Sequence, residues 1–147
     1  MSHPAEQTIE LTSDPCELAT AREAVRGWIA DLGWGELRVA DVVLAADEAL
    51  TNVMRHGYQG QCGKTIQIFL REIRDESHGP GIEIEIRDWG RQVPLDKICG
   101  RDLDDIRPGG LGVHIIRNLM DEAVYTHAEG GGMRLIMRKY HVPGPPK

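Results

Sequence analysis

The chain has 147 residues, which is enough for one domain with a substantial hydrophobic core. Only 5% of the residues are aromatic, so aliphatic side chains must build that core. The formal net charge of −6 argues against a nucleic-acid binder, which usually presents a basic face, and would suit a basic protein partner. No apolar run approaches the roughly 20 residues that span a membrane, and no signal peptide is recognisable. We therefore expect a cytoplasmic protein that binds neither nucleic acid nor membrane.

The first third of the chain predicts one strand and two helices. Residues 7–11 are expected to form a short strand, and Asp14-Pro15-Cys16-Glu17 is typical of a capping box with proline at the first helical position. The helix that follows carries apolar residues at helical spacing and ends at Gly33 and Gly35. A second helix is expected from about Gly35 to Arg55.

The second predicted helix carries a carboxylate and a carboxamide on its polar side. At about 100° per residue, Glu48 and Asn52 fall one turn apart, opposite Ala46 and its apolar neighbours. Such a pair can hold a general base and a neutral oxygen ligand for Mg²⁺ beside a phosphate chain. An ordinary solvated helix face has the same spacing, so the pair alone does not distinguish the two interpretations.

Two strands are expected near residues 65–73 and 81–87. In the second strand, Ile82, Ile84 and Ile86 alternate with charged residues, which is typical of a half-buried antiparallel strand. Asp88 has the parity of the isoleucines, and a carboxylate on a buried face is costly unless something donates to it. With Gly90 two residues later, this pattern indicates a flat ligand that donates to Asp88, or an aspartate that starts a turn.

Residues 94–110 are irregular and acidic, and a surface loop or a lid would both fit this composition. Gly109, Gly110 and Gly112 stand at the start of a helix expected over residues 111–120. A helix start offers free N–H groups to a phosphate. A glycine-rich linker would have the same composition, so the glycines alone do not distinguish the two interpretations. The segment is neither a Walker A loop nor a dinucleotide fingerprint.

The last part of the chain predicts two strands, near residues 123–128 and 133–140, joined by a hairpin turn at 129–132. Residues 142–147 are rich in proline and are expected to form a disordered tail, which leaves residues 1–141 as a single domain. Cys16, Cys62 and Cys99 have no metal-binding spacing and an odd count, so we expect free thiols in a reducing cytosol.

Three segments resemble, in order and spacing, the ATPase fold shared by gyrase B subunits, histidine kinases and MutL proteins (the GHKL, or Bergerat, fold). DEALTNVMRHGY resembles the N-box, IRDWG the first glycine box and RPGGLGVHII the second. Within that fold, the short chain resembles anti-sigma-factor serine kinases of the RsbW type over nearly its whole length. We expect a two-layer α/β sandwich, with a mixed, mostly antiparallel sheet covered by helices on one face.

The resemblance also implies roles for individual residues. Glu48 would be the general base, and Asn52 would bind Mg²⁺ through its side-chain oxygen. Asp88 would accept from the adenine amino group, with Gly90 making room for the ring. The segment Gly109-Gly110-Leu111-Gly112 would close over the phosphates.

Two arginines complete the roles that the resemblance implies. Arg107 is a plausible charge partner for the terminal phosphate. Arg134 stands where relatives often have a threonine near the adenine carboxylate, which puts the detail of that contact in doubt.

The function implied is an ATP-dependent protein serine/threonine kinase with ATP and Mg²⁺ as cofactors. Its implied partners are a sigma factor or similar regulator, held inactive, and a small antagonist protein that is phosphorylated; a homodimer is expected. An alternative is a nucleotide-gated binding module without kinase activity. A detached histidine-kinase ATPase domain ranks last, because no helix with a phosphoacceptor histidine stands upstream in the sequence.

Overall fold

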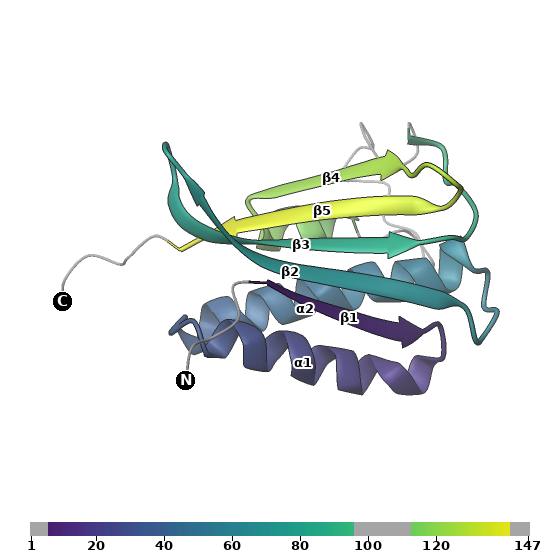
Figure 1. The fold of residues 1–147 in the computed structure, drawn as a ribbon, viewed down its shortest axis with the longest axis horizontal. Helices are drawn as coiled ribbons and strands as arrows, with labels where there is room; N and C mark the ends of the chain where they lie inside the picture. Colours follow the sequence, from purple (N-terminus) through teal and green to yellow (C-terminus); the bar gives the residue numbers. More distant parts are fainter. Residues whose placement is uncertain (1–5, 96–112, 142–147) are drawn as a thin grey trace.

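The structure, a computed structural model, describes residues 6–95 and 113–141. These residues form a two-layer sandwich in which helices cover one face of a five-stranded sheet (Figure 1). The strand order is β1-β2-β3-β5-β4, and all four pairings among the described strands are antiparallel. The expected sandwich is therefore confirmed, with a sheet that is antiparallel throughout its described part rather than mixed.

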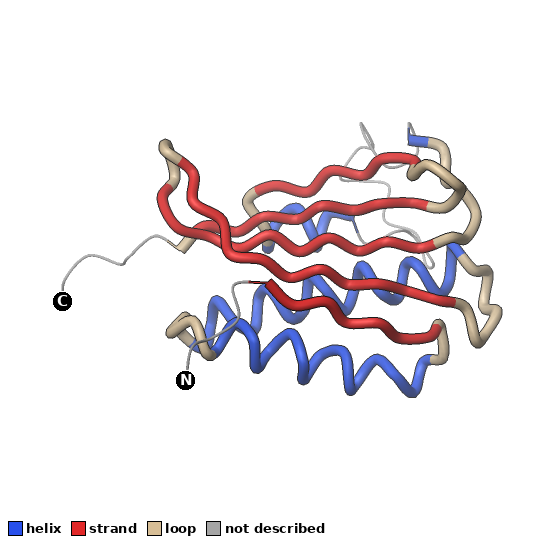
Figure 2. The backbone as a smooth tube through the Cα atoms, viewed as in Figure 1, coloured by secondary structure: helices blue, strands red, loops and turns tan. Residues whose placement is uncertain are grey.

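The elements follow the order expected from the sequence. The strands are β1 (Glu6–Thr12), β2 (Thr65–Asp75), β3 (Gly79–Asp88), β4 (Glu122–His127) and β5 (Met133–Tyr140). The α-helices are α1 (Leu18–Ala30), α2 (Glu36–Asn52) and α3 (Val113–Leu119). A short 3₁₀ turn, η1 (Pro15–Glu17), precedes α1, and a π-helical turn, η2 (Val53–Gly57), extends α2. In Figure 2, the blue helices α2 and α3 pass partly behind the red strands, and α1 lies below them in this view.

The core lies between the helices and the inner face of the sheet. Ile82, Ile84 and Ile86 of β3 are fully buried there, as their alternation predicts. Small side chains on α2, such as Ala45 and Ala49, are also buried and let this helix lie close to the strands. Tight packing of this kind holds α2 in a defined position relative to the end of β3.

The expected capping box does not form. Asp14 precedes a 3₁₀ turn, and its side chain makes no capping hydrogen bond. Instead, the carboxylates of Asp14 and Glu17 both accept from the hydroxyl of Thr12, and Glu17 Oε1 accepts from the Thr12 N–H at 3.2 Å. Thr12, the last residue of β1, therefore binds the two carboxylates that were expected to cap the start of the helix.

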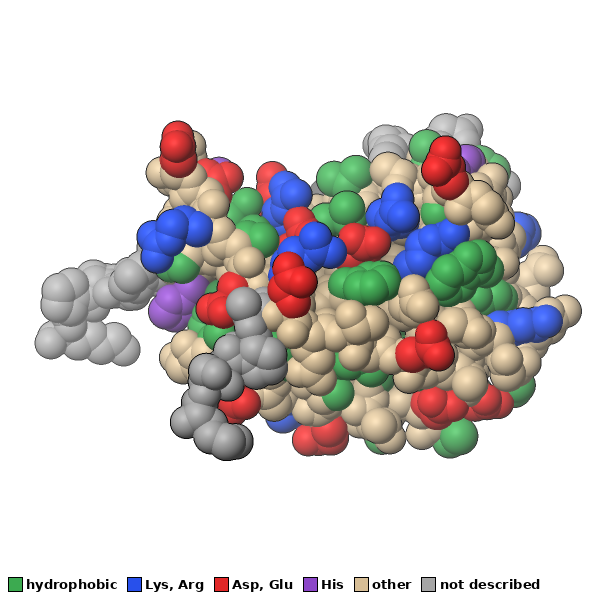
Figure 3. Space-filling model, in the orientation of Figure 1, with side chains coloured by type: hydrophobic (Ala, Val, Ile, Leu, Met, Phe, Trp, Pro, Cys, Tyr) green, Lys and Arg blue, Asp and Glu red, His purple; other side chains and the backbone are tan. Residues whose placement is uncertain are grey.

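The other face of the sheet carries a ladder of ion pairs. Glu83 pairs with Arg71 and Arg138, while Glu85 pairs with Arg71 and Arg134, at distances of 2.8 to 3.3 Å. Red and blue side chains accordingly lie side by side across the middle of this face, with apolar ones between them (Figure 3). None of the described helices combines the length and the apolar character needed to cross a bilayer.

Candidate functional site

A pocket opens between α2, the turn η2 and the inner face of β3, β4 and β5. Its walls are mostly apolar, with a few polar side chains among them: the lining residues are Ala49, Asn52, Val53, His56, Gly57, Ile86, Asp88, Val93, Tyr125, Met133 and Leu135. A largely apolar cavity with a few placed polar groups is the usual form of a small-molecule site. Two of the residues selected from the sequence, Asn52 and Asp88, line this pocket together.

Asp88 ends β3 on the buried face, with 2% of its surface exposed. Its Oδ1 accepts from the backbone N–H of Gly90 at 2.9 Å and from that of Met133 at 3.3 Å. Burial raises the pKa of the Asp88 carboxyl, and these two N–H groups and Arg87 oppose that rise. Both hydrogen bonds go to Oδ1, so no described residue donates to Oδ2, which leaves an acceptor for a ligand in the pocket.

Gly90 lies where the end of β3 meets the turn η2. A Cβ at this position would overlap the carbonyl group of Gly57 and lie 3.0 Å from the Tyr58 ring. The backbones join here, because Arg91 N–H donates to Gly57 O at 2.7 Å. A glycine is therefore needed at position 90 because the two backbones approach each other here. This reason differs from the one suggested by the sequence, which was room for the ring of a ligand.

Asn52 is the last residue of α2 and is only 7% exposed. The sequence placed it on a polar helix face, and the structure corrects this placement. The buried side of α2 is wider than the valine and leucine positions indicate, because alanines extend it, and Asn52 faces the pocket beside Ala49. Glu48 lies one turn earlier and is half-buried.

Tyr125 on β4 is a pocket residue that the sequence reasoning missed. Its hydroxyl oxygen is buried and has no partner at good hydrogen-bond geometry, although the Asn52 side chain lies close enough to act on it. Burial raises the pKa of Tyr125 to about 12; Asn52 and Arg117 oppose the rise, while Asp88 and Glu48 add to it. The signal was present in the strand, since Tyr125 pairs with Leu135 and so shares its inward parity.

These features agree with a comparison of the whole sequence with known families. Residues 11–139 match the family described as the histidine kinase-like ATPase domain. The chain belongs to this family. The family description names an ATPase, which implies ATP as the ligand of this domain.

Relatives within the family carry a more specific name. A protein called serine-protein kinase RsbW from Listeria innocua is 27% identical over 139 residues, covering 90% of this chain and 85% of its own length. The protein of the same name from Bacillus thuringiensis is 29% identical over 127 residues, covering 84% of this chain and 77% of its own length.

Solved structures share the fold of this family member. The RsbU and RsbW domains of a Mycobacterium tuberculosis protein superpose with a TM-score of 0.61 at 19% identity, covering 93% of this chain. The chain spans about a third (32%) of the length of that structure. A blue-light activated histidine kinase from Erythrobacter litoralis superposes with a TM-score of 0.52 at 20% identity, covering 85% of this chain and 40% of its own.

Several residues selected from the family's motifs lie outside the described part of the chain. They are Arg107, Gly109, Gly110, Leu111 and Gly112, all between residues 96 and 112. Cys99 and the tail at 142–147 are likewise outside it. Within the described part, Cys16 and Cys62 are free, exposed thiols.

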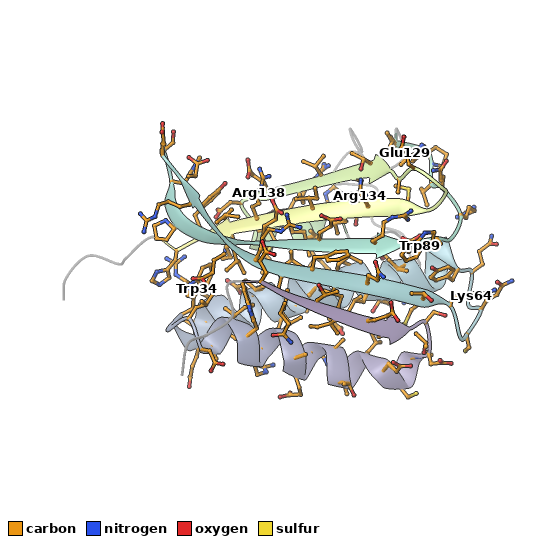
Figure 4. The ribbon with its side chains drawn as sticks, viewed as in Figure 1. Trp34, Lys64, Trp89, Glu129, Arg134 and Arg138 are labelled. Carbon is orange, nitrogen blue, oxygen red and sulfur yellow. The ribbon has the colours of Figure 1, made fainter. Side chains whose placement is uncertain are left out.

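Arg134 does not lie at the pocket. Alternation along β5 places Met133 and Leu135 on the pocket wall and turns Arg134 to the other face, where its Nε donates to Glu85 Oε2 at 3.0 Å. Figure 4 shows Arg134 and Arg138 along β5, with Trp89 at the end of β3. The contact with Asp88 from this strand is instead the backbone N–H of Met133. Arg134 therefore does not stand near the Asp88 carboxylate, where the resemblance had placed it.

A metal ion held by the protein alone would need several ligating side chains close together. The described residues contain no group of three or more His, Cys, Asp or Glu side chains that could hold a metal ion. Mg²⁺ commonly keeps several waters and is held by one or two side chains together with substrate phosphates. The carboxamide of Asn52, buried at the pocket wall, could supply one such ligand.

Proposed function

We propose that this chain is an ATP-dependent protein serine/threonine kinase that switches between two protein partners. The observation that carries the proposal is that one pocket holds the buried carboxylate of Asp88 and the carboxamide of Asn52, with the half-buried Glu48 one helical turn before Asn52. The relatives called serine-protein kinase support the reaction class. The single domain at residues 1–141 would act in the cytoplasm as a homodimer.

Each described residue has a distinct part in this proposal. Asp88 holds the nucleotide by accepting a hydrogen bond from the amino group of the base. Asn52 orients the phosphate chain and supplies an oxygen ligand to Mg²⁺. Glu48 takes the proton of the attacking serine hydroxyl. Bound Mg-ATP supplies the transferable phosphate and the charge neutralisation, so the protein contributes mainly positioning.

The glycine-rich segment completes the proposed site. Gly109, Gly110, Leu111 and Gly112 would close over the phosphates, and Arg107 would balance the charge of the terminal one. Closure of this kind excludes water from the transfer and commits the phosphate to the protein acceptor.

The proposed partners are a sigma factor or similar regulator, which the chain holds inactive, and a small antagonist protein. Phosphorylation adds a charge of about −1.5 to −2 to the antagonist. Because this chain is itself acidic, with a formal net charge of −6, the added charge would weaken the contact. The phosphorylated antagonist would then leave the chain free to hold the regulator.

The test combines partner capture with phosphate transfer. Partners are recovered from a native cytosolic extract with the purified chain, with and without Mg-ATP, and identified by mass spectrometry. Each is then incubated with the chain and ATP labelled at the terminal phosphate, with Glu48→Gln as the control. A labelled serine on a small partner, whose affinity for the chain then falls, supports the kinase switch. Tight ATP-dependent binding without any label would overturn it and leave a nucleotide-gated binding module.

A further inference from the structure

The hydroxyl of Tyr125 is a buried polar group that the proposed mechanism does not use. It projects from β4 into the pocket, and its oxygen is shielded from solvent. The Asn52 side chain approaches this oxygen closely enough to lower the pKa, but the hydroxyl's own proton has no acceptor among the described residues. Native proteins satisfy the large majority of such groups, because a buried hydroxyl without a partner costs stability. A buried donor left open inside a ligand pocket indicates that the ligand provides its acceptor.

The surroundings of Tyr125 keep the hydroxyl in its donor form. Burial is the main cause of its raised pKa, and the nearby charges of Asp88 and Glu48 add to it, so the phenol stays protonated at physiological pH. The carboxylate of Asp88, in the same pocket, accepts hydrogen bonds from backbone N–H groups and offers an acceptor to a ligand. Among the polar side chains of the pocket wall, which also include Asn52 and His56, Asp88 thus offers an acceptor and Tyr125 a donor, between apolar side chains such as Ile86 and Leu135.

This arrangement is complementary to a flat ring that carries an amino donor and a ring-nitrogen acceptor. We propose that Tyr125 donates a hydrogen bond to a ring nitrogen of the purine base, which makes it a specificity-determining residue of the nucleotide pocket. The proposal rests on the proposed ATP site and deepens it. A guanine base would place a carbonyl oxygen where Asp88 requires a donor, so the pair of Asp88 and Tyr125 would select adenine.

The first arm of the test separates a ligand-binding hydroxyl from a structural one. In calorimetry, Tyr125→Phe should bind ATP roughly 3- to 10-fold more weakly than the wild type, the loss of one neutral hydrogen bond. Without nucleotide, the same variant should unfold at the same or a higher temperature, since it loses only an unsatisfied polar group. Tyr58→Phe is the matched control, because the Tyr58 hydroxyl is already hydrogen-bonded and its loss should lower the unfolding temperature.

The second arm locates the acceptor with the 1-deaza, 3-deaza and 7-deaza analogues of ATP. The analogue that lacks the acceptor should bind the wild type and Tyr125→Phe equally, while the other two should keep the difference. Equal ATP affinity of the two proteins, a lower unfolding temperature of nucleotide-free Tyr125→Phe, or a difference retained by all three analogues would each overturn the proposal. Failure of the wild type to bind ATP at all would instead refute the proposed function.

Discussion

The hydroxyl of Tyr58 accepts a hydrogen bond from the backbone N–H of Trp89 at 2.8 Å. The same hydroxyl donates to the carbonyl oxygen of Thr65 at 2.5 Å. One side chain from the turn after α2 therefore ties together the start of β2 and the end of β3. Asp88 and Gly90 flank Trp89, so this tie positions both residues of the predicted base-binding segment.

We predict that Tyr58→Phe destabilises the fold. The substitution removes two part-buried hydrogen bonds, to the Trp89 N–H and the Thr65 carbonyl, and a hydrogen bond of this kind contributes about 0.5–1.5 kcal/mol. Urea unfolding should show a lower midpoint with an unchanged slope. Tyr140→Phe is a suitable control, since its hydroxyl bonds only the half-exposed Glu122 carboxylate. Equal midpoints for wild type and Tyr58→Phe would contradict the structural role.

Asp88→Asn should weaken ATP binding by roughly tenfold to a hundredfold. A charge-assisted hydrogen bond is worth about 1.5–3 kcal/mol, and the amide presents a donor as well as an acceptor to the base. Calorimetry with ATP and GTP would measure both affinity and selectivity. An unchanged ATP affinity in a folded Asp88→Asn protein would remove Asp88 from the base-binding role.

The same variant should be at least as stable as the wild type at neutral pH without nucleotide. The native pKa of Asp88 is raised by burial, so the native state holds its proton more tightly than the unfolded state does. That contribution to stability is present below the unfolded pKa and is lost as pH rises through the native pKa. The stability of the wild type relative to Asp88→Asn should therefore rise on acidification through this window, which urea unfolding at several pH values would detect.

Glu48→Gln and Asn52→Ala should separate chemistry from binding. The amide of Glu48→Gln cannot take the serine proton, so phosphate transfer should be lost while ATP affinity is kept. Asn52→Ala should lose Mg²⁺-dependent ATP binding as well as turnover. Single-turnover transfer and calorimetry with and without Mg²⁺ would measure the two effects. A wild-type transfer rate in Glu48→Gln would exclude Glu48 as the base.

Gly90→Ala should destabilise the chain, and Gly27→Ala should not. A Cβ at Gly90 would press into the Gly57 carbonyl group, and overpacking of this kind costs about 1–3 kcal/mol. Gly27 lies on the exposed side of α1 with nothing within 4 Å of an added Cβ. Alanine there should raise helix stability by about 0.5–1 kcal/mol. Matching thermal unfolding curves for the two variants would show that the backbone approach at Gly90 can relax.

Predictions from the sequence were correct where the two-residue alternation of a strand or the order of the motifs determined the structure. Alternation in β3 placed Asp88 on the buried face, and the order of the motifs led to the correct sandwich fold. The helical spacing was less reliable for Asn52. It identified the buried side of α2 from valine and leucine alone, whereas alanines also pack against the sheet when a helix lies close to it.

Contacts between distant segments were harder to predict. The capping box failed because the Thr12 hydroxyl lies within reach of both carboxylates once β1 is placed. The inward position of Tyr125 could have been read from parity, but its nearness to Asp88 and Asn52 depends on the strand order, which no local pattern contains. The same holds for Arg134, whose distance from Asp88 follows from the face of β5 it occupies.

The pairing of β3 with β5 has a consequence for folding kinetics. Asp88 and the Met133 N–H that supports it lie 45 positions apart, with α3 and β4 between them. Closing so long a loop carries an entropic cost before the contact forms, so this edge of the pocket should assemble late in folding. A nucleotide can recognise only the completed pocket, and it should therefore slow unfolding of the chain without accelerating its folding.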